Sequence, residues 1–102
     1  MGCDAVVGSH PHVLQHAETY EGVPIAYSLG NFCFGGNSGP ADTDSAIERL
    51  QILRTDDGFT IGEADFLPCC ISSARGYNDF RPRLYSPEEP EYERILKRLE
   101  MP

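Results

Sequence analysis

The chain has 102 residues, the size of one small domain, and 40% of them are hydrophobic, so a core can form. Its formal net charge of -8 argues against the basic face that sequence-independent binding to nucleic acid requires. No apolar run is long enough to span a bilayer, and the N-terminus lacks the cationic and apolar regions of a signal peptide.

Residues 4–8 are expected to form a short strand. Ala5, Val6 and Val7 make a continuous apolar run, which is typical of a strand covered on both faces. A buried strand that begins so close to Met1 suggests that the chain is cut from a longer domain.

A β-hairpin is predicted over residues 13–29, with its turn at Glu21-Gly22. The glycine-rich residues 30–44 then read as a loop. Such a loop could cradle a phosphate with its backbone N–H groups, but the strand, helix and lysine of a P-loop are missing, and a plain connection between hairpins fits as well.

Residues 45–54 fit either a helix or a strand. The Asp57-Gly58 turn signal that follows, and the β-rich residues 59–71 after it, favour a second hairpin. The apolar residues of the returning strand change phase along its length. A β-bulge near Gly62 would reconcile the two phases.

A C-terminal helix is predicted from Ser86 onward, with the serine as N-cap and Pro87 at the first position. Pro90 could shift this start by a few residues. The helix carries an apolar stripe at i, i+3, i+4 and i+7 spacing, which would dock onto this chain's own sheet or onto a part of the domain outside the chain. The stripe consists of Tyr92, Ile95, Leu96 and Leu99.

Two histidines, His10 and His12, flank Pro11 directly after the first predicted strand. In extended backbone, residues two apart point to the same side, so both rings could reach one cation or one each of a close pair. The spacing alone is weak support for a metal site, because loop histidines are common. A complete site needs more ligands, and nothing fixes the nearby ionisable residues on the same face: Asp4, His16 and Glu18.

Three motifs in a fixed order resemble the bacterial capsule-synthesis (poly-gamma-glutamate biosynthesis) protein family. They are GSHPHVLQ at 8–15, the glutamate and YEG of 18–22, and YSLGNF at 27–32. The resemblance is strong over the first third of the chain and looser over the strand, the RPRLYSP segment and the helix that follow.

The resemblance implies an α+β fold. The chain would be a β-rich fragment, two hairpins plus a C-terminal helix, of a metallophosphoesterase-like four-layer αββα sandwich. Residues 1–102 would form the C-terminal portion of that single domain. In such enzymes a late His-x-His motif gives one histidine to each of two divalent metals, so the resemblance assigns His10 and His12 as metal ligands. Asn31 would hydrogen-bond beside that site, or only shape the turn after the third strand.

The resemblance also implies that the earlier metal-binding motifs lie before Met1. The chain would then be a fragment of a capsule biosynthesis protein with two residual ligands, for Mn, Fe or Zn without distinction. The alternative is a non-catalytic fragment that acts as a small structural or self-associating unit, and by itself the chain is expected to be inactive. Expected partners are the missing N-terminal part of the domain or a second copy. The family is typically located at the cell envelope, whereas a chain without a signal would stay in the cytoplasm.

Overall fold

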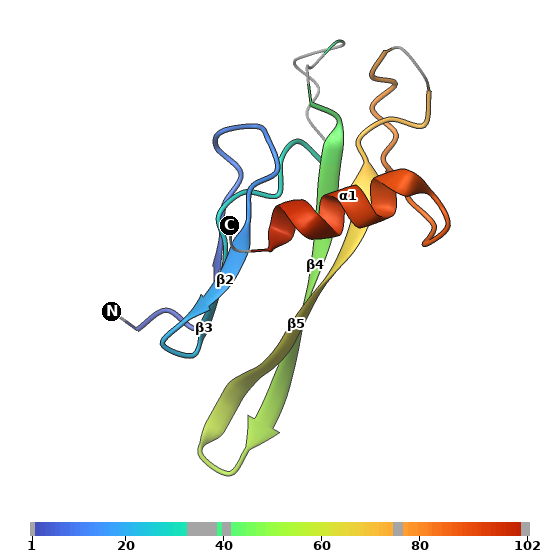
Figure 1. Cartoon of the computed structure of the whole chain (residues 1–102). Coiled ribbons are helices and arrows are strands. Elements are labelled where there is room, and N and C mark those ends of the chain that lie inside the picture. The colour runs from blue at the N-terminus through green and yellow to red at the C-terminus, as the bar shows by residue number, and fades with distance from the viewer. Residues whose placement is uncertain (1, 33–38, 40–41, 75–76, 101–102) are drawn as a thin grey trace.

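The structure, a computed structural model, describes residues 2–32, 39, 42–74 and 77–100. These residues form two three-stranded sheets and one helix, in agreement with the predicted α+β class (Figure 1). The first sheet has the strand order β1-β3-β2 and the second β4-β5-β6. The elements are β1 (Val6–Val7), β2 (Ala17–Tyr20), β3 (Val23–Ala26), β4 (Asp44–Thr55), β5 (Gly58–Cys70), β6 (Arg83–Leu84) and α1 (Pro90–Leu99). No helix in this part of the chain is long and apolar enough to cross a membrane.

The first predicted hairpin is confirmed. Strands β2 and β3 pair antiparallel, and Glu21 and Gly22 connect them with φ of 50° and 81°. Positive φ at both central residues is the signature of a type I′ turn, whose twist matches that of paired strands. The strands are shorter than predicted. Beyond them the pairing continues through hydrogen bonds from the Tyr27 amide to the His16 carbonyl and from the Gln15 amide to the Ser28 carbonyl, and through a bridge between Leu14 and Leu29.

Strand β1 lies at the edge of the first sheet, parallel to β3, and its predicted burial is wrong. Val6 and Val7 are 42% and 53% exposed. Burial depends on what covers a strand, and only β3 pairs with β1 among the described residues. The sheet therefore ends on an open, apolar edge.

The second hairpin is also confirmed, and it is the longest feature of the molecule (Figure 1). Its tip consists of Asp56 and Asp57, one residue earlier than predicted, because Gly58 already pairs with Thr55. The predicted bulge is present. Between the pairs Leu50–Ala64 and Ile52–Ile61, β5 has two residues where β4 has only Gln51, and the extra length falls at Gly62.

Helix α1 begins at Pro90 and not after Ser86. Glu89 is the N-cap, with a ψ of 137°, because a residue before proline is driven out of the helical region. The predicted stripe packs against this chain's own strands. Ile95 is fully buried and Leu99 nearly so, in a cluster that includes Leu14, Ala46 and Tyr85.

Two arginines on the helix also anchor it. Arg94 and Arg98 both hydrogen-bond the carboxylate of Asp44, which is almost completely buried at the start of β4. Arg98 further reaches the carboxylate of Asp42 and the carbonyl oxygen of Leu14, the latter at 2.6 Å. The helix thereby holds the segment that directly follows the two histidines.

Candidate metal-binding turn and cleft

The two histidines lie in a tight turn and not in extended backbone, so the extended geometry expected for them is wrong. The His12 amide donates to the Ser9 carbonyl oxygen at 3.0 Å, and His12 has a φ of 61°. Gly8 fixes where this turn begins. Its amide donates to the Ala26 carbonyl and its own carbonyl accepts from the Leu29 amide, both at 2.9 Å. The chain is held against β3 up to Gly8 and must then reverse.

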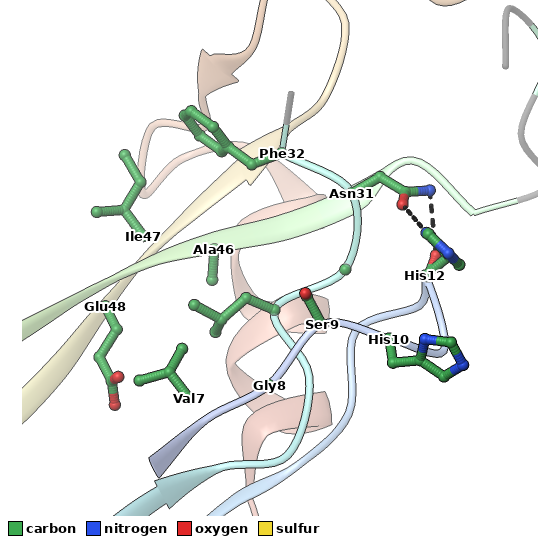
Figure 2. Close-up of a pocket in the computed structure, with 12 residues that line it drawn as sticks. Val7, Gly8, Ser9, His10, His12, Asn31, Phe32, Ala46, Ile47 and Glu48 are labelled. Carbon is green, nitrogen blue, oxygen red and sulfur yellow. Dashed lines mark hydrogen bonds between the residues drawn. The ribbon is translucent and has the colours of Figure 1, made fainter. Parts of the chain in front are cut away.

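The turn still brings the imidazoles of His10 and His12 together. Their ring centroids are 6.1 Å apart and both residues are exposed (Figure 2). Two imidazoles on one tetrahedral zinc ion would have centroids roughly 5 Å apart, since each nitrogen lies about 2 Å from the metal. The observed spacing is wider, so the two rings would have to move closer to share one ion.

Asn31 contacts His12 with both ends of its side-chain amide (Figure 2). His12 Nδ1 lies 2.7 Å from Asn31 Oδ1, and Asn31 Nδ2 donates to the His12 carbonyl oxygen at 3.2 Å. A carbonyl oxygen only accepts, so Nδ1 must carry the proton, and the ring lone pair is then on Nε2. Asn31 is 7% exposed, so it is a fixed partner for this ring.

Gly30 allows Asn31 to take this position. Its φ is 76°, and a Cβ at residue 30 would lie 2.9 Å from the Asp44 carbonyl oxygen. Only glycine combines that backbone conformation with so close an approach to β4.

The histidine turn borders a cleft of about 780 Å³ between the two sheets. Its walls are largely apolar, with Val7 and Leu29 from the first sheet and its connections, and Ile47 from the second. Glu48 lies at the end away from the histidines in the view of Figure 2. Its Oε1 is buried and has no hydrogen-bond partner among the residues that the structure describes, and burial raises the pKa of this carboxyl.

The sequence reasoning missed Glu48, although a signal was present. It shares the inward phase of β4 with Ala46 and Leu50, where an apolar residue is expected.

The other ionisable residues near the motif do not gather around it. The ring of His16 packs on that of Tyr27 at 4.7 Å, and the Tyr27 hydroxyl donates to Glu18. Asp4 is exposed. Within the described ranges, no three His, Cys, Asp or Glu side chains are placed to hold a metal ion together. The described residues therefore offer two candidate ligands at this turn, His10 and His12, and Asn31 hydrogen-bonds one of them.

The same segment that builds the turn carries the family match. Residues 1–36 match the family described as bacterial capsule synthesis protein PGA_cap. This match covers about the first third of the chain. The resemblance noted from the motifs is thus confirmed over the histidine turn, Asn31 and the first sheet.

Two curated proteins are similar to part of the chain. The chain is 45% identical over 58 residues to the PGA biosynthesis protein CapA of Bacillus subtilis (strain 168), and 58% identical over 33 residues to the capsule biosynthesis protein CapA of Bacillus anthracis. These matches cover 56% and 32% of this chain but only 15% and 8% of the two relatives. No solved structure matches the chain.

Proposed function

We propose that the chain is the part of a capsule (poly-gamma-glutamate) biosynthesis protein that supplies His10 and His12 to a metal-dependent, phosphoesterase-like site. The relatives' names support the biosynthetic role. The observation that carries the metal site is the pair of imidazoles at 6.1 Å, with Asn31 fixing the tautomer of His12. The two sheets on either side of the cleft would be part of a four-layer αββα sandwich.

In this proposal the chain's residues have separate tasks. His12 would ligate through Nε2, because Nδ1 donates to Asn31. His10 would ligate a second ion from the neighbouring position on the turn. Two divalent ions would supply an activated water and stabilise charge on a phosphoryl group. Imidazole ligands suit several divalent metals, so Mn, Fe and Zn are all compatible with this pair.

The donor set fits half of such a site. Structural and catalytic zinc sites use at least three protein ligands, and the described residues bring two histidines together. The remaining ligands would come from another part of the domain or from a second copy of the chain. The same shortage of ligands favours a second candidate, a non-catalytic unit that serves a structural or self-associating role.

Isothermal titration with Mn²⁺ and Zn²⁺ tests the proposal. Wild-type chain should bind at micromolar affinity or better, and a His10→Ala/His12→Ala variant should not bind. His16→Ala is the matched control, since that histidine lies outside the turn against Tyr27. Asn31→Ala should weaken binding about 10-fold or more, as expected when the partner of a ligating histidine is lost.

Each result is decisive for this chain. Binding that is lost in the double variant and kept in His16→Ala would support the histidine site, and a phosphodiesterase assay would follow. Absence of binding, or equal binding by the double variant, would contradict metal ligation by these residues alone and favour the structural unit.

A further inference from the structure

The backbone at Gly30 packs against two other stretches of the chain at once. A Cβ at this position would lie 2.9 Å from the Asp44 carbonyl oxygen and 3.4 Å from the Leu14 amide nitrogen. Leu14 follows His12 by two residues. Asn31 comes directly after Gly30. The spacing between the two neighbouring stretches therefore decides where Asn31 lies relative to the ring of His12.

Arg98 bridges these two stretches from the helix. Its Nη2 donates to the Leu14 carbonyl oxygen at 2.6 Å, and its Nη1 donates to the Asp44 carboxylate at 2.9 Å. Both nitrogens also donate to the carboxylate of Asp42, at 2.7 and 3.2 Å. The C-terminal end of α1 points toward the first sheet, which brings Arg98 to this junction (Figure 1). A guanidinium is a planar and rigid fork of donors, so these contacts fix positions as well as balance charge.

The junction is largely closed to water. The side chain of Arg98 is 30% exposed, and those of Asp42 and Asp44 are 22% and 6% exposed. Charge-assisted hydrogen bonds in such a place are strong, because water and salt screen them less than at the surface. The fully buried Ser45 donates to the Leu29 carbonyl oxygen at 2.6 Å. Leu29 is thus hydrogen-bonded to the start of β4, which Arg98 in turn fixes to the segment after the histidine turn.

We propose that Arg98 is a positioning residue, which keeps the Asn31 amide on the ring of His12. It acts through the backbone, by fixing Leu14 against Asp44. This role rests on the proposed function in that His12 is taken as a metal ligand. The tautomer of His12 can nevertheless be measured without any metal, so the two proposals can fail separately.

Arg94 provides a matched control on the same helix. Its Nε donates to the Asp44 carboxylate at 3.1 Å, but within the described ranges it has no hydrogen bond to Leu14. Loss of either arginine removes one positive charge and contacts to Asp44, so both variants should weaken the docking of α1. An effect of docking alone would appear in both variants. An effect of the bridge to Leu14 would appear only when Arg98 is replaced.

Long-range proton–nitrogen NMR at about pH 8, where imidazoles are neutral, reports which ring nitrogen of His12 carries the proton. Wild-type chain and Arg94→Met should show His12 protonated at Nδ1, and Arg98→Met should show a mixture of the two tautomers. In titration with Zn²⁺, Arg98→Met should bind about 10-fold more weakly than Arg94→Met. That is the low end of the roughly 10–100-fold loss expected when a ligating histidine loses its hydrogen-bond partner.

Circular dichroism first shows whether each variant is folded. If Arg98→Met does not fold, Arg98→Lys is measured in its place. Lysine keeps the charge but replaces the planar fork with one compact ammonium group. Arg98→Lys should therefore show the same mixture of His12 tautomers.

A single tautomer of His12 in the Arg98 variants would overturn the proposal, as would the same mixture in Arg94→Met or in wild type. If wild type binds Zn²⁺, equal affinity in Arg94→Met and Arg98→Met would overturn it too. Failure of the metal site gives a different result. Wild type would then not bind Zn²⁺, while the tautomers would still differ between the two arginine variants.

Discussion

Replacement of Gly30 by alanine tests whether the connection between the first sheet and β4 positions the histidine turn. Gly30 has a φ of 76°, and a Cβ there would meet the Asp44 carbonyl oxygen at 2.9 Å. Gly22 is the matched control, because its φ is 81° but nothing lies within 4 Å of an added Cβ. The two variants therefore share the backbone cost and differ in the steric clash.

The magnitudes follow from this comparison. A left-handed conformation costs a non-glycine residue about 1–2 kcal/mol, and the loss of unfolded-state entropy returns about 0.4–1 kcal/mol. Gly22→Ala should therefore lower the free energy of unfolding by about 1 kcal/mol or less. At Gly30 the clash is with backbone in a packed region, where overpacking costs a further 1–3 kcal/mol or so. Gly30→Ala should then lose about 2–4 kcal/mol.

Urea unfolding followed by circular dichroism measures both variants against wild type. The Gly30→Ala midpoint should fall clearly below that of Gly22→Ala, since a small domain has only about 5 kcal/mol or a little more to lose. Asn31 directly follows Gly30 in the chain and hydrogen-bonds His12, so Gly30→Ala should also weaken any metal binding by that histidine. Equal midpoints for the two variants would refute the close approach of residue 30 to Asp44 and, with it, this account of how Asn31 is placed.

Three further outcomes are expected. Ile95→Ala should lower the free energy of unfolding by about 2–5 kcal/mol in urea titration, because this side chain of α1 is fully buried. A change below about 0.5 kcal/mol would mean that the helix is not docked on the strands. Burial raises the pKa of Cys69 to about 11, so mass mapping at pH 8 should find Cys3 alkylated long before Cys69, unless the chain is first unfolded. Burial alone would raise the pKa of Asp42, but hydrogen bonds from Arg98 and from a backbone amide outweigh it and lower that pKa. The stability gained is present above the ordinary pKa near 4 and is lost as pH falls through the lower folded value. An Asp42→Asn variant should therefore be less stable than wild type at about pH 6, and this difference should shrink as the pH is lowered below about 4.

Local signals in the sequence were sufficient for the hairpins and the bulge. The phase change around Gly62 is visible without any knowledge of tertiary structure, and Asp-Gly sequences mark turns by their own backbone preferences. The start of α1 was misplaced because both Pro87 and Pro90 suit a first helical position. The choice between them is made by the extended conformation that Pro90 imposes on Glu89.

The parts of the site that were not predicted depend on residues far apart in the chain. Asn31 reaches His12 from 19 positions away, and no local pattern shows that its amide would face both the ring and the backbone. The exposure of Val7 reflects what is not packed beside it, which an apolar run cannot reveal. Glu48 lines a cleft between two sheets and lacks a hydrogen-bond partner among the described residues, and neither feature follows from the sequence of β4 alone.

The hydrogen bond from Arg98 to the Leu14 carbonyl joins residues 84 positions apart. At typical translation speeds of about 5–20 residues per second, the ribosome would need roughly 4–17 s to synthesise the residues between them. The segment after the histidine turn therefore emerges well before the helix that anchors it, and contacts of such long sequence separation form slowly. During that interval the edge of β1 can still pair with another extended segment. The hydrogen bond that holds the segment after the histidine turn forms only once α1 has been synthesised.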